Sequence, residues 1–170
     1  MTSEKSGTVP ATLLEGRFTG RTDFAELIRQ ALGTAAAQGW REIILSDPDF
    51  EDWPLGERVV AQALNDWSRT GRKLTMLARN YDAVLRRHAR FVVWRRNWAH
   101  IVECRSSAAT PADTLPSALW SPGWVFERLD LQRCTGIAGL EVARRLALKE
   151  RLNEGLLNSS PAFPATILGL

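Results

Sequence analysis

The chain has 170 residues, of which 45% are hydrophobic and 24% are charged, so it is long and apolar enough for one domain with a full core. Its formal net charge of +3 is too small to mark a nucleic-acid-binding protein by itself. No apolar run approaches the roughly 18 residues that a membrane span needs. The sequence therefore predicts a cytoplasmic protein with no membrane partner.

Three regions follow one another along the chain. Residues 1–10 are small and polar and are expected to be disordered. Residues 11–158 are expected to form a single α/β domain, and residues 159–170 form an apolar tail that contains proline. This tail is expected to dock on the domain or on a second copy, because it is too rich in proline for a helix and too apolar for free solvent.

The first predicted elements are a short strand or lead-in at residues 12–18 and a helix that ends at Gly39. The helix is predicted from a single apolar stripe with helical spacing, and Thr22 is its expected N-cap. The stripe consists of Phe24, Leu27, Ile28, Ala31, Leu32 and Ala35.

Strands and helices then alternate. Short apolar runs predict buried strands at residues 40–46, 72–79, 100–105 and 124–129. Helices are predicted at residues 54–70, from Asn80 through about Trp98, and at residues 140–153, with a loop at residues 106–121. This order predicts an α/β fold with a mixed β-sheet flanked by helices.

An acidic turn, Asp47-Pro48-Asp49-Phe50-Glu51-Asp52, follows the predicted strand at residues 40–46. A strand that ends in Asp-x-Asp resembles the motif of haloacid-dehalogenase-like enzymes, in which the first aspartate attacks phosphate with the help of Mg²⁺. Glu51 stands where that family has threonine or valine, and no later Asp-Asp pair completes a metal site. The favoured interpretation is that these carboxylates cap the following helix, with Asp-dependent phosphate chemistry as an alternative.

Other chemistry has weaker support. The two cysteines, Cys104 and Cys134, form no CxxC unit, and neither they nor His88 and His100 have the close spacing of a zinc site. Free packed thiols are expected, although a disulfide stays open. There is no G-x-G-x-x-G motif and no Walker lysine motif, so no cofactor and no metal are predicted.

An arginine-rich segment with interleaved aromatic residues spans residues 79–105. It contains seven arginines against Asp82 and Glu103, a net charge of +5. One interpretation is that the aromatic residues belong to the core while the arginines cover an outer face, some of them paired with the acidic turn. The alternative is a nucleic-acid or polyanion-binding surface in which arginines neutralise phosphates and Tyr81, Trp94 and Trp98 stack on bases.

The order of elements resembles one half of the phospholipase D-like fold. The similarity is to a family of uncharacterised proteobacterial domains of this fold, and it spans about residues 20–158. The segments that carry it are Ile43–Asp47, Gly71–Arg79, Arg86–His88 with Trp94–Arg96, and Gly136–Leu146.

Active members of that superfamily use a His-x-Lys pair on a strand. Residues 124–129 read WVFERL, with neither histidine nor lysine, and His100 is followed by Ile101 and Val102. The resemblance therefore implies the scaffold without phosphodiester chemistry, and it does not predict an enzyme. Because two half-units pack together in that superfamily, it also implies a homodimer.

These observations predict a non-catalytic binding or assembly module whose ligand surface lies where the strands end. The nucleic-acid-binding module and the Asp-dependent enzyme stay as alternatives. The candidate binding residues are Asp47, Arg79, Asn80, Tyr81, Arg86, Arg87, Arg95 and Arg96.

Overall fold

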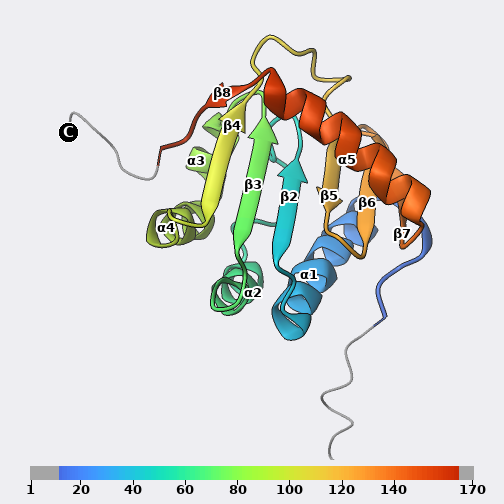
Figure 1. Ribbon diagram of the computed structural model, residues 1–170, viewed down its shortest axis with the longest axis horizontal. Helices are drawn as coiled ribbons and strands as arrows, with labels where there is room; N and C mark the ends of the chain where they lie inside the picture. Colours follow the sequence, from blue (N-terminus) through green and yellow to red (C-terminus); the bar gives the residue numbers. More distant parts are fainter. Residues whose placement is uncertain (1–11, 165–170) are drawn as a thin grey trace, which may run out of the picture.

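The computed structural model describes residues 12–164, which form one sheet between two layers of helices (Figure 1). The strands are β1 (Gly16–Thr19), β2 (Glu42–Ser46), β3 (Lys73–Ala78), β4 (Val102–Ser106), β5 (Ser117–Trp120), β6 (Val125–Asp130), β7 (Thr135–Gly139) and β8 (Ser160–Pro161). The helices are α1 (Arg21–Gln38), α2 (Arg58–Ser68), α3 (Asp82–Arg87), α4 (Ala89–Asn97) and α5 (Val142–Leu157).

The eight strands lie in the order β1-β7-β6-β5-β2-β3-β4-β8. β2, β3 and β4 are parallel, and every other neighbouring pair is antiparallel. The mixed sheet confirms the predicted fold class. Because the three parallel strands end at one edge of the sheet, the turns that follow Ser46, Ala78 and Ser106 lie beside one another.

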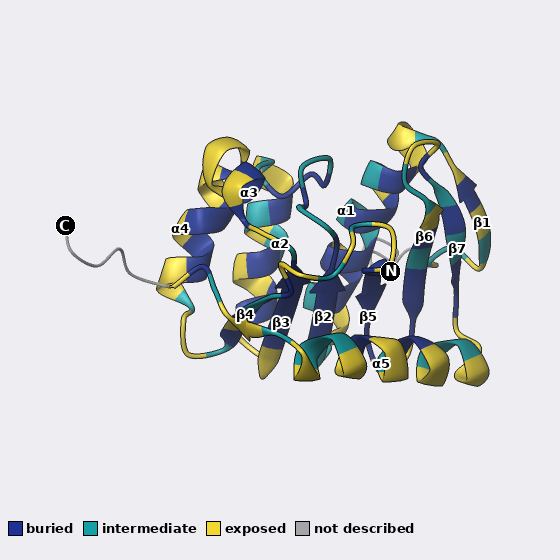
Figure 2. Cartoon of the chain, turned by 90° about the horizontal axis from the view of Figure 1, so that it is seen from above, coloured by how far each residue is buried: buried dark blue, intermediate teal, exposed yellow. Residues whose placement is uncertain are grey.

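The helices cover both faces of the sheet. Figure 2 shows α1 to α4 on one face and α5 alone on the other. The larger core lies under α1 to α4 and includes a cluster of aromatic rings around Phe126, whose centroid is 5.7 to 6.1 Å from those of Phe18, Phe24, Trp53 and Trp124. A smaller core forms where α5 packs on the sheet. Within residues 12–164, no helix has the length and apolar character of a membrane span.

The first helix forms as its apolar stripe predicts. All six residues of the stripe are buried, and α1 ends at Gly39, which adopts the left-handed conformation that glycine tolerates best. The expected cap is wrong: α1 begins at Arg21, Gly20 occupies the N-cap position, and no side chain caps the helix. A backbone hydrogen bond from the Gly20 amide to the carbonyl of Cys134 instead joins the start of the helix to the residue before β7.

Besides the two-residue β8, two strands lie where the sequence predicts none. β5 falls inside the predicted loop at residues 106–121, and β7 falls in a segment with two glycines before the last helix. Both are short, and both are stabilised by neighbours on each side rather than by local propensity. β5 joins the parallel strands to the antiparallel part of the sheet, so the sequence interpretation missed a central strand.

Helix boundaries also differ from the prediction. α2 begins at Arg58 rather than at Pro54, and its residues Val60, Leu64 and Trp67 are buried. The helix predicted from Asn80 is broken at His88 into α3 and α4. Leu85 of α3 is 53% exposed.

The tail docks on the domain as far as the structure describes it. β8 pairs with β4, the backbone amide of Ala162 donates to the carbonyl of Cys104 at 3.0 Å, and the Phe163 ring is buried. The predictions for residues 1–10 and for the end of the tail lie outside the described residues.

Candidate functional site

The turns that follow β2 and β3 meet at the carboxyl edge of the parallel strands. The backbone amide of Arg79 donates to the carbonyl of Pro48 at 2.9 Å, which joins the two turns directly. Asp47 therefore lies close to Arg79, Asn80 and Tyr81 in the fold, as the sequence predicts. Two hollows open at this edge, one containing Asp47 and the other containing Arg79.

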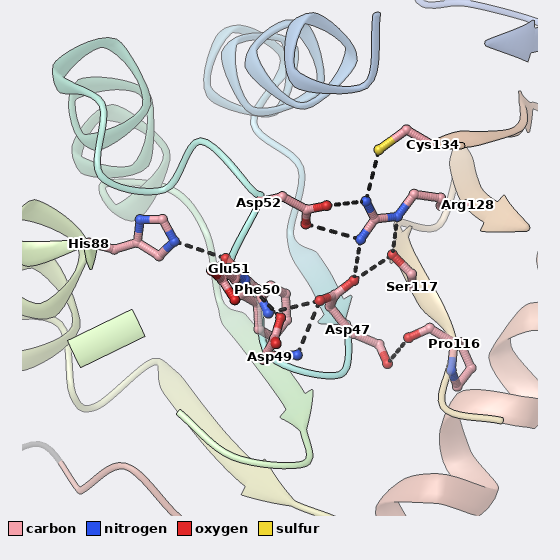
Figure 3. Close-up of polar contacts among 11 residues, drawn as sticks. Asp47, Asp49, Phe50, Glu51, Asp52, His88, Pro116, Ser117, Arg128 and Cys134 are labelled. Carbon is pink, nitrogen blue, oxygen red and sulfur yellow. Dashed lines mark hydrogen bonds and ion pairs between the residues drawn. The ribbon is translucent and has the colours of Figure 1, made fainter. Parts of the chain in front are cut away.

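A buried arginine of β6, Arg128, organises the first of these hollows (Figure 3). Its guanidinium donates to Asp47 Oδ1 at 2.8 Å, to both oxygens of Asp52 at 2.6 and 3.1 Å, to Ser117 Oγ at 3.1 Å and to Cys134 Sγ at 3.1 Å. These five contacts use all five N–H donors of an arginine. The side chain therefore has no donor left for a ligand.

The carboxylate of Asp47 is equally occupied. Oδ1 accepts from Arg128 and from Ser117 Oγ at 2.6 Å, and Oδ2 accepts from the backbone amides of Asp49 and Phe50 at 3.2 and 2.8 Å. Burial raises the pKa of Asp47, while Arg128, Ser117 and the two amides act in the opposite direction. All four partners are donors, so the geometry fits the ionised carboxylate.

Because the hydrogen-bonding groups of both side chains are already engaged, we assign Asp47 and Arg128 a structural role. Both oxygens of Asp47 are engaged and the side chain is buried, which does not suit a nucleophile that must attack phosphate. The predicted capping of the following helix is wrong: Asp47 and Asp49 cap the turn itself, through the amides of residues 49–51, and α2 starts only at Arg58 without a side-chain cap. Among residues 12–164 there is no cluster of three or more acidic, histidine or cysteine side chains able to hold a metal ion.

The turn also holds one strained residue. Phe50 is fully buried at a φ of 59°, a conformation that costs about 1–3 kcal/mol for a non-glycine residue. Asp47 accepts from its amide, and His88 Nε2 donates to its carbonyl at 2.8 Å. Because His88 lies at the junction of α3 and α4, this contact fixes both helices relative to the end of β2.

The first hollow, called here the carboxylate hollow, has a volume of about 600 Å³. It is lined by Arg21, Ala25, Asp47, Pro48, Asp49, Glu51, Asp52, Arg87, Ala112, Arg128 and Leu131. Four carboxylates face three guanidiniums, and Arg87 already pairs with Glu51 at 3.3 Å. This balance of charge does not favour an anionic ligand.

The second hollow, called here the Tyr81 hollow, has a volume of about 570 Å³ and lies between α3, α4 and the docked tail. It is lined by Arg79, Asn80, Tyr81, Asp82, Leu85, Arg96, Ser106, Ala162, Phe163 and Pro164. Two arginines here face a single carboxylate. Four of the eight candidate residues from the sequence, namely Arg79, Asn80, Tyr81 and Arg96, therefore meet in one place.

Helix α3 lines both hollows, with Arg87 at the carboxylate hollow and Leu85 at the Tyr81 hollow, and α3 and α4 together carry a basic surface. Arg86, Arg87, Arg90 and Arg96 are exposed on them, and Asp82 is the one exposed carboxylate of these two helices. This set of four arginines is called here the arginine surface. Arg90 donates to the carbonyl of Gly56 at 2.9 Å, while Arg86 and Arg96 have no carboxylate partner within residues 12–164.

The interpretation that places the aromatic residues in the core is confirmed for Trp94, whereas the candidate binding residue Arg95 and the stacking role of Trp94 are wrong. Arg95 is buried and donates to the carbonyls of Val102 and Phe163 at 3.1 and 3.2 Å, so it anchors the tail instead of facing a ligand. Trp94 is buried in the core with its indole N–H on Ser68 Oγ at 2.8 Å, and it cannot stack on a base. Trp98 is half-buried and bonded to Asn65.

The thiol of Cys104 lies behind the Tyr81 hollow and is not a nucleophile at neutral pH. Burial raises its pKa to about 12, Arg95 opposes the shift and Glu103 adds to it. The unfolded chain ionises this thiol near its ordinary pKa, so between the two values the unfolded state binds fewer protons. The free energy of unfolding is therefore expected to fall as pH rises through this interval, by up to about 1.4 kcal/mol per pH unit.

Urea denaturation from about pH 8 to 10 checks this expectation, with Cys104→Ala as the comparison. The alanine variant is expected to show a shallower fall of the unfolding free energy with pH. Identical slopes for the two proteins would contradict the raised pKa.

The residue that sequence reasoning missed is Arg128. A signal was present: with period two along β6, Arg128 shares a face with the buried Phe126, and a cation on a core face needs a partner. That partner, Asp47, lies 81 residues away in the sequence, so the pattern along β6 could not identify it.

No family model and no curated protein matches the chain. Among solved structures, it is similar to TrmBL2, an archaeal chromatin protein described as showing a novel mode of DNA binding. The TM-score is 0.60 at 16% sequence identity, over 89% of this chain and 55% of that chain. The chain thus spans about half the length of TrmBL2, and at this identity the similarity shows the fold alone.

Proposed function

We propose that the chain is a non-catalytic nucleic-acid-binding module that contacts the phosphate backbone through the arginine surface of α3 and α4. The observation that carries this proposal is the charge balance of these helices, four exposed arginines against one exposed carboxylate. Guanidinium groups pair bidentately with phosphate oxygens, which suits arginine better than lysine for this task. The phospholipase D-like resemblance of the scaffold, without its catalytic pair, belongs to the same proposal.

Two further observations support the proposal. The solved structure of similar fold comes from a protein described as binding DNA. In addition, charged side chains of the carboxylate hollow pair with one another. A phosphate is therefore expected to bind there less favourably than at the arginine surface. Binding by charge alone predicts a strong dependence on salt and a weak dependence on sequence.

The test is a fluorescence anisotropy titration of a labelled single-stranded DNA at salt concentrations from about 50 to 200 mM. For the wild-type protein, the logarithm of the association constant is expected to fall linearly with the logarithm of the salt concentration. The double variant Arg86→Gln/Arg90→Gln removes two phosphate contacts and is expected to lower that slope by about 1.4, because each contact to a single strand contributes about 0.7.

A matched control variant is Arg69→Gln/Arg72→Gln. These two arginines are also exposed, but they precede β3 and lie at the opposite edge of the sheet. The control is expected to keep the wild-type slope. Equal losses in both double variants would point to diffuse attraction and contradict the proposed surface, and no binding at low salt would overturn the function.

A further inference from the structure

We propose that the Tyr81 hollow receives one unpaired base of a bound single strand. The inference rests on the proposed function and names the form of nucleic acid that the site takes. Phosphates on the arginine surface would hold the strand, and the adjoining hollow would hold a base that has left the stack.

The walls of the hollow suit the flat, apolar face of a base. Tyr81 and Phe163 form an aromatic pair with ring centroids 5.2 Å apart that is largely buried and lines the hollow with only a small part of its surface, and Leu85, 53% exposed, lies at the rim. The hollow's volume of about 570 Å³ exceeds what one base needs. Tyr81 Oη donates to the carbonyl of Arg105 at 2.9 Å, so its ring is held in place before any ligand arrives.

The Tyr81 hollow contains hydrogen-bond donors that a ligand could satisfy with an acceptor. Arg79 Nε is buried and has no hydrogen-bond partner among residues 12–164, and the one contact of its Nη2 is a long 3.5 Å to the carbonyl of Ala108. An unpaired buried donor is unfavourable unless a ligand supplies the acceptor. Arg96 lines the same hollow, so a phosphate or a base carbonyl there would meet two guanidiniums.

The rim also offers groups that match the edge of a base. Asn80 Oδ1 caps the amide of Asp82 at 3.1 Å, which leaves the amide group of Asn80 and the carboxylate of Asp82 exposed beside the apolar walls. A base edge carries both donors and acceptors, whereas a duplex keeps its bases stacked and paired. The hollow is therefore expected to distinguish a single strand from a duplex of equal charge.

The experiment compares three labelled probes with the full chain in anisotropy titrations at low salt. The probes are an oligothymidylate, an abasic sugar-phosphate strand of the same length, and a duplex. Wild-type protein is expected to bind the oligothymidylate about tenfold more tightly than the abasic strand, because the apolar side chains of the hollow cover part of one base.

The variant Leu85→Gln is expected to reduce the oligothymidylate affinity to that of the abasic strand without changing the abasic affinity. Its matched control is Leu146→Gln on α5, which replaces another exposed leucine and is expected to change neither. Equal wild-type affinities for the oligothymidylate and the abasic strand would overturn the base site while leaving the arginine surface intact. Absence of binding to all three probes would overturn both proposals, and tight binding of free thymidine monophosphate with no binding of the strand would replace them with a small-anion site.

Discussion

Replacing Arg128 with methionine is expected to lower the free energy of unfolding by about 3–5 kcal/mol. Methionine fills most of the volume, but it leaves Asp47 buried with an uncompensated charge and removes the donors that Asp52, Ser117 and Cys134 use. Contacts with the Phe24 ring, 4.2 Å from the guanidinium carbon, are lost as well. The expected loss of stability arises where β6 contacts the turn after β2.

Urea denaturation of the wild type and of Arg128→Met measures this effect, and pH identifies its cause. Without the guanidinium, burial is opposed only by Ser117 and the two amides and raises the pKa of Asp47 further, so the folded variant retains a proton that the unfolded chain loses. The variant's deficit is therefore expected to be smaller near pH 4 than near pH 8. The exposed Arg86→Met serves as control and is expected to stay within about 0.5 kcal/mol of wild type. A deficit below about 1 kcal/mol for Arg128→Met would contradict the buried ion pair.

Replacing Gly136 with alanine is the second change with a large expected effect. A Cβ atom at this position in β7 would lie 2.1 Å from the backbone carbonyl oxygen of Glu127 and 2.8 Å from the Cα of Arg128. Both neighbours are backbone atoms of β6 and cannot rotate away, so β7 must move off its partner. We expect a loss of about 3 kcal/mol or more, above the usual range for a single added methyl group.

The matched control is Gly33→Ala in α1, where a new Cβ meets no atom within 4 Å. Alanine favours a helix over glycine, so this variant is expected to gain up to about 1 kcal/mol. Thermal and urea denaturation compare the two variants. A Gly136→Ala protein as stable as the wild type would show that β7 does not approach β6 as closely as described.

Much of the fold could be predicted, because the periods of helices and strands are local. The stripe from Phe24 to Ala35, the buried run of β2 and the inward face of α2 all lie where their spacing indicates. The missed strands β5 and β7 have weak local signals and depend on the neighbours that complete their hydrogen bonds.

The candidate site could likewise be predicted only in part. The sequence identified the residues at the ends of β2 and β3, and the structure brings Asp47 and Arg79 together there. The sequence could not separate exposed arginines from buried ones. Arg86 and Arg95 belong to the same basic segment, but Arg86 is exposed and Arg95 is buried under the tail.

By itself, then, the sequence determined the alternation of strands and helices, the mixed α/β class and the basic character of residues 79–105. Only the tertiary structure decided that Arg128 neutralises Asp47, that Arg95 anchors the tail, and that Arg96 of the arginine surface lines the Tyr81 hollow. The physical reason is that periodicity is set within one element. Which charge loses its water, and which keeps it, depends instead on elements that become neighbours only when the sheet assembles.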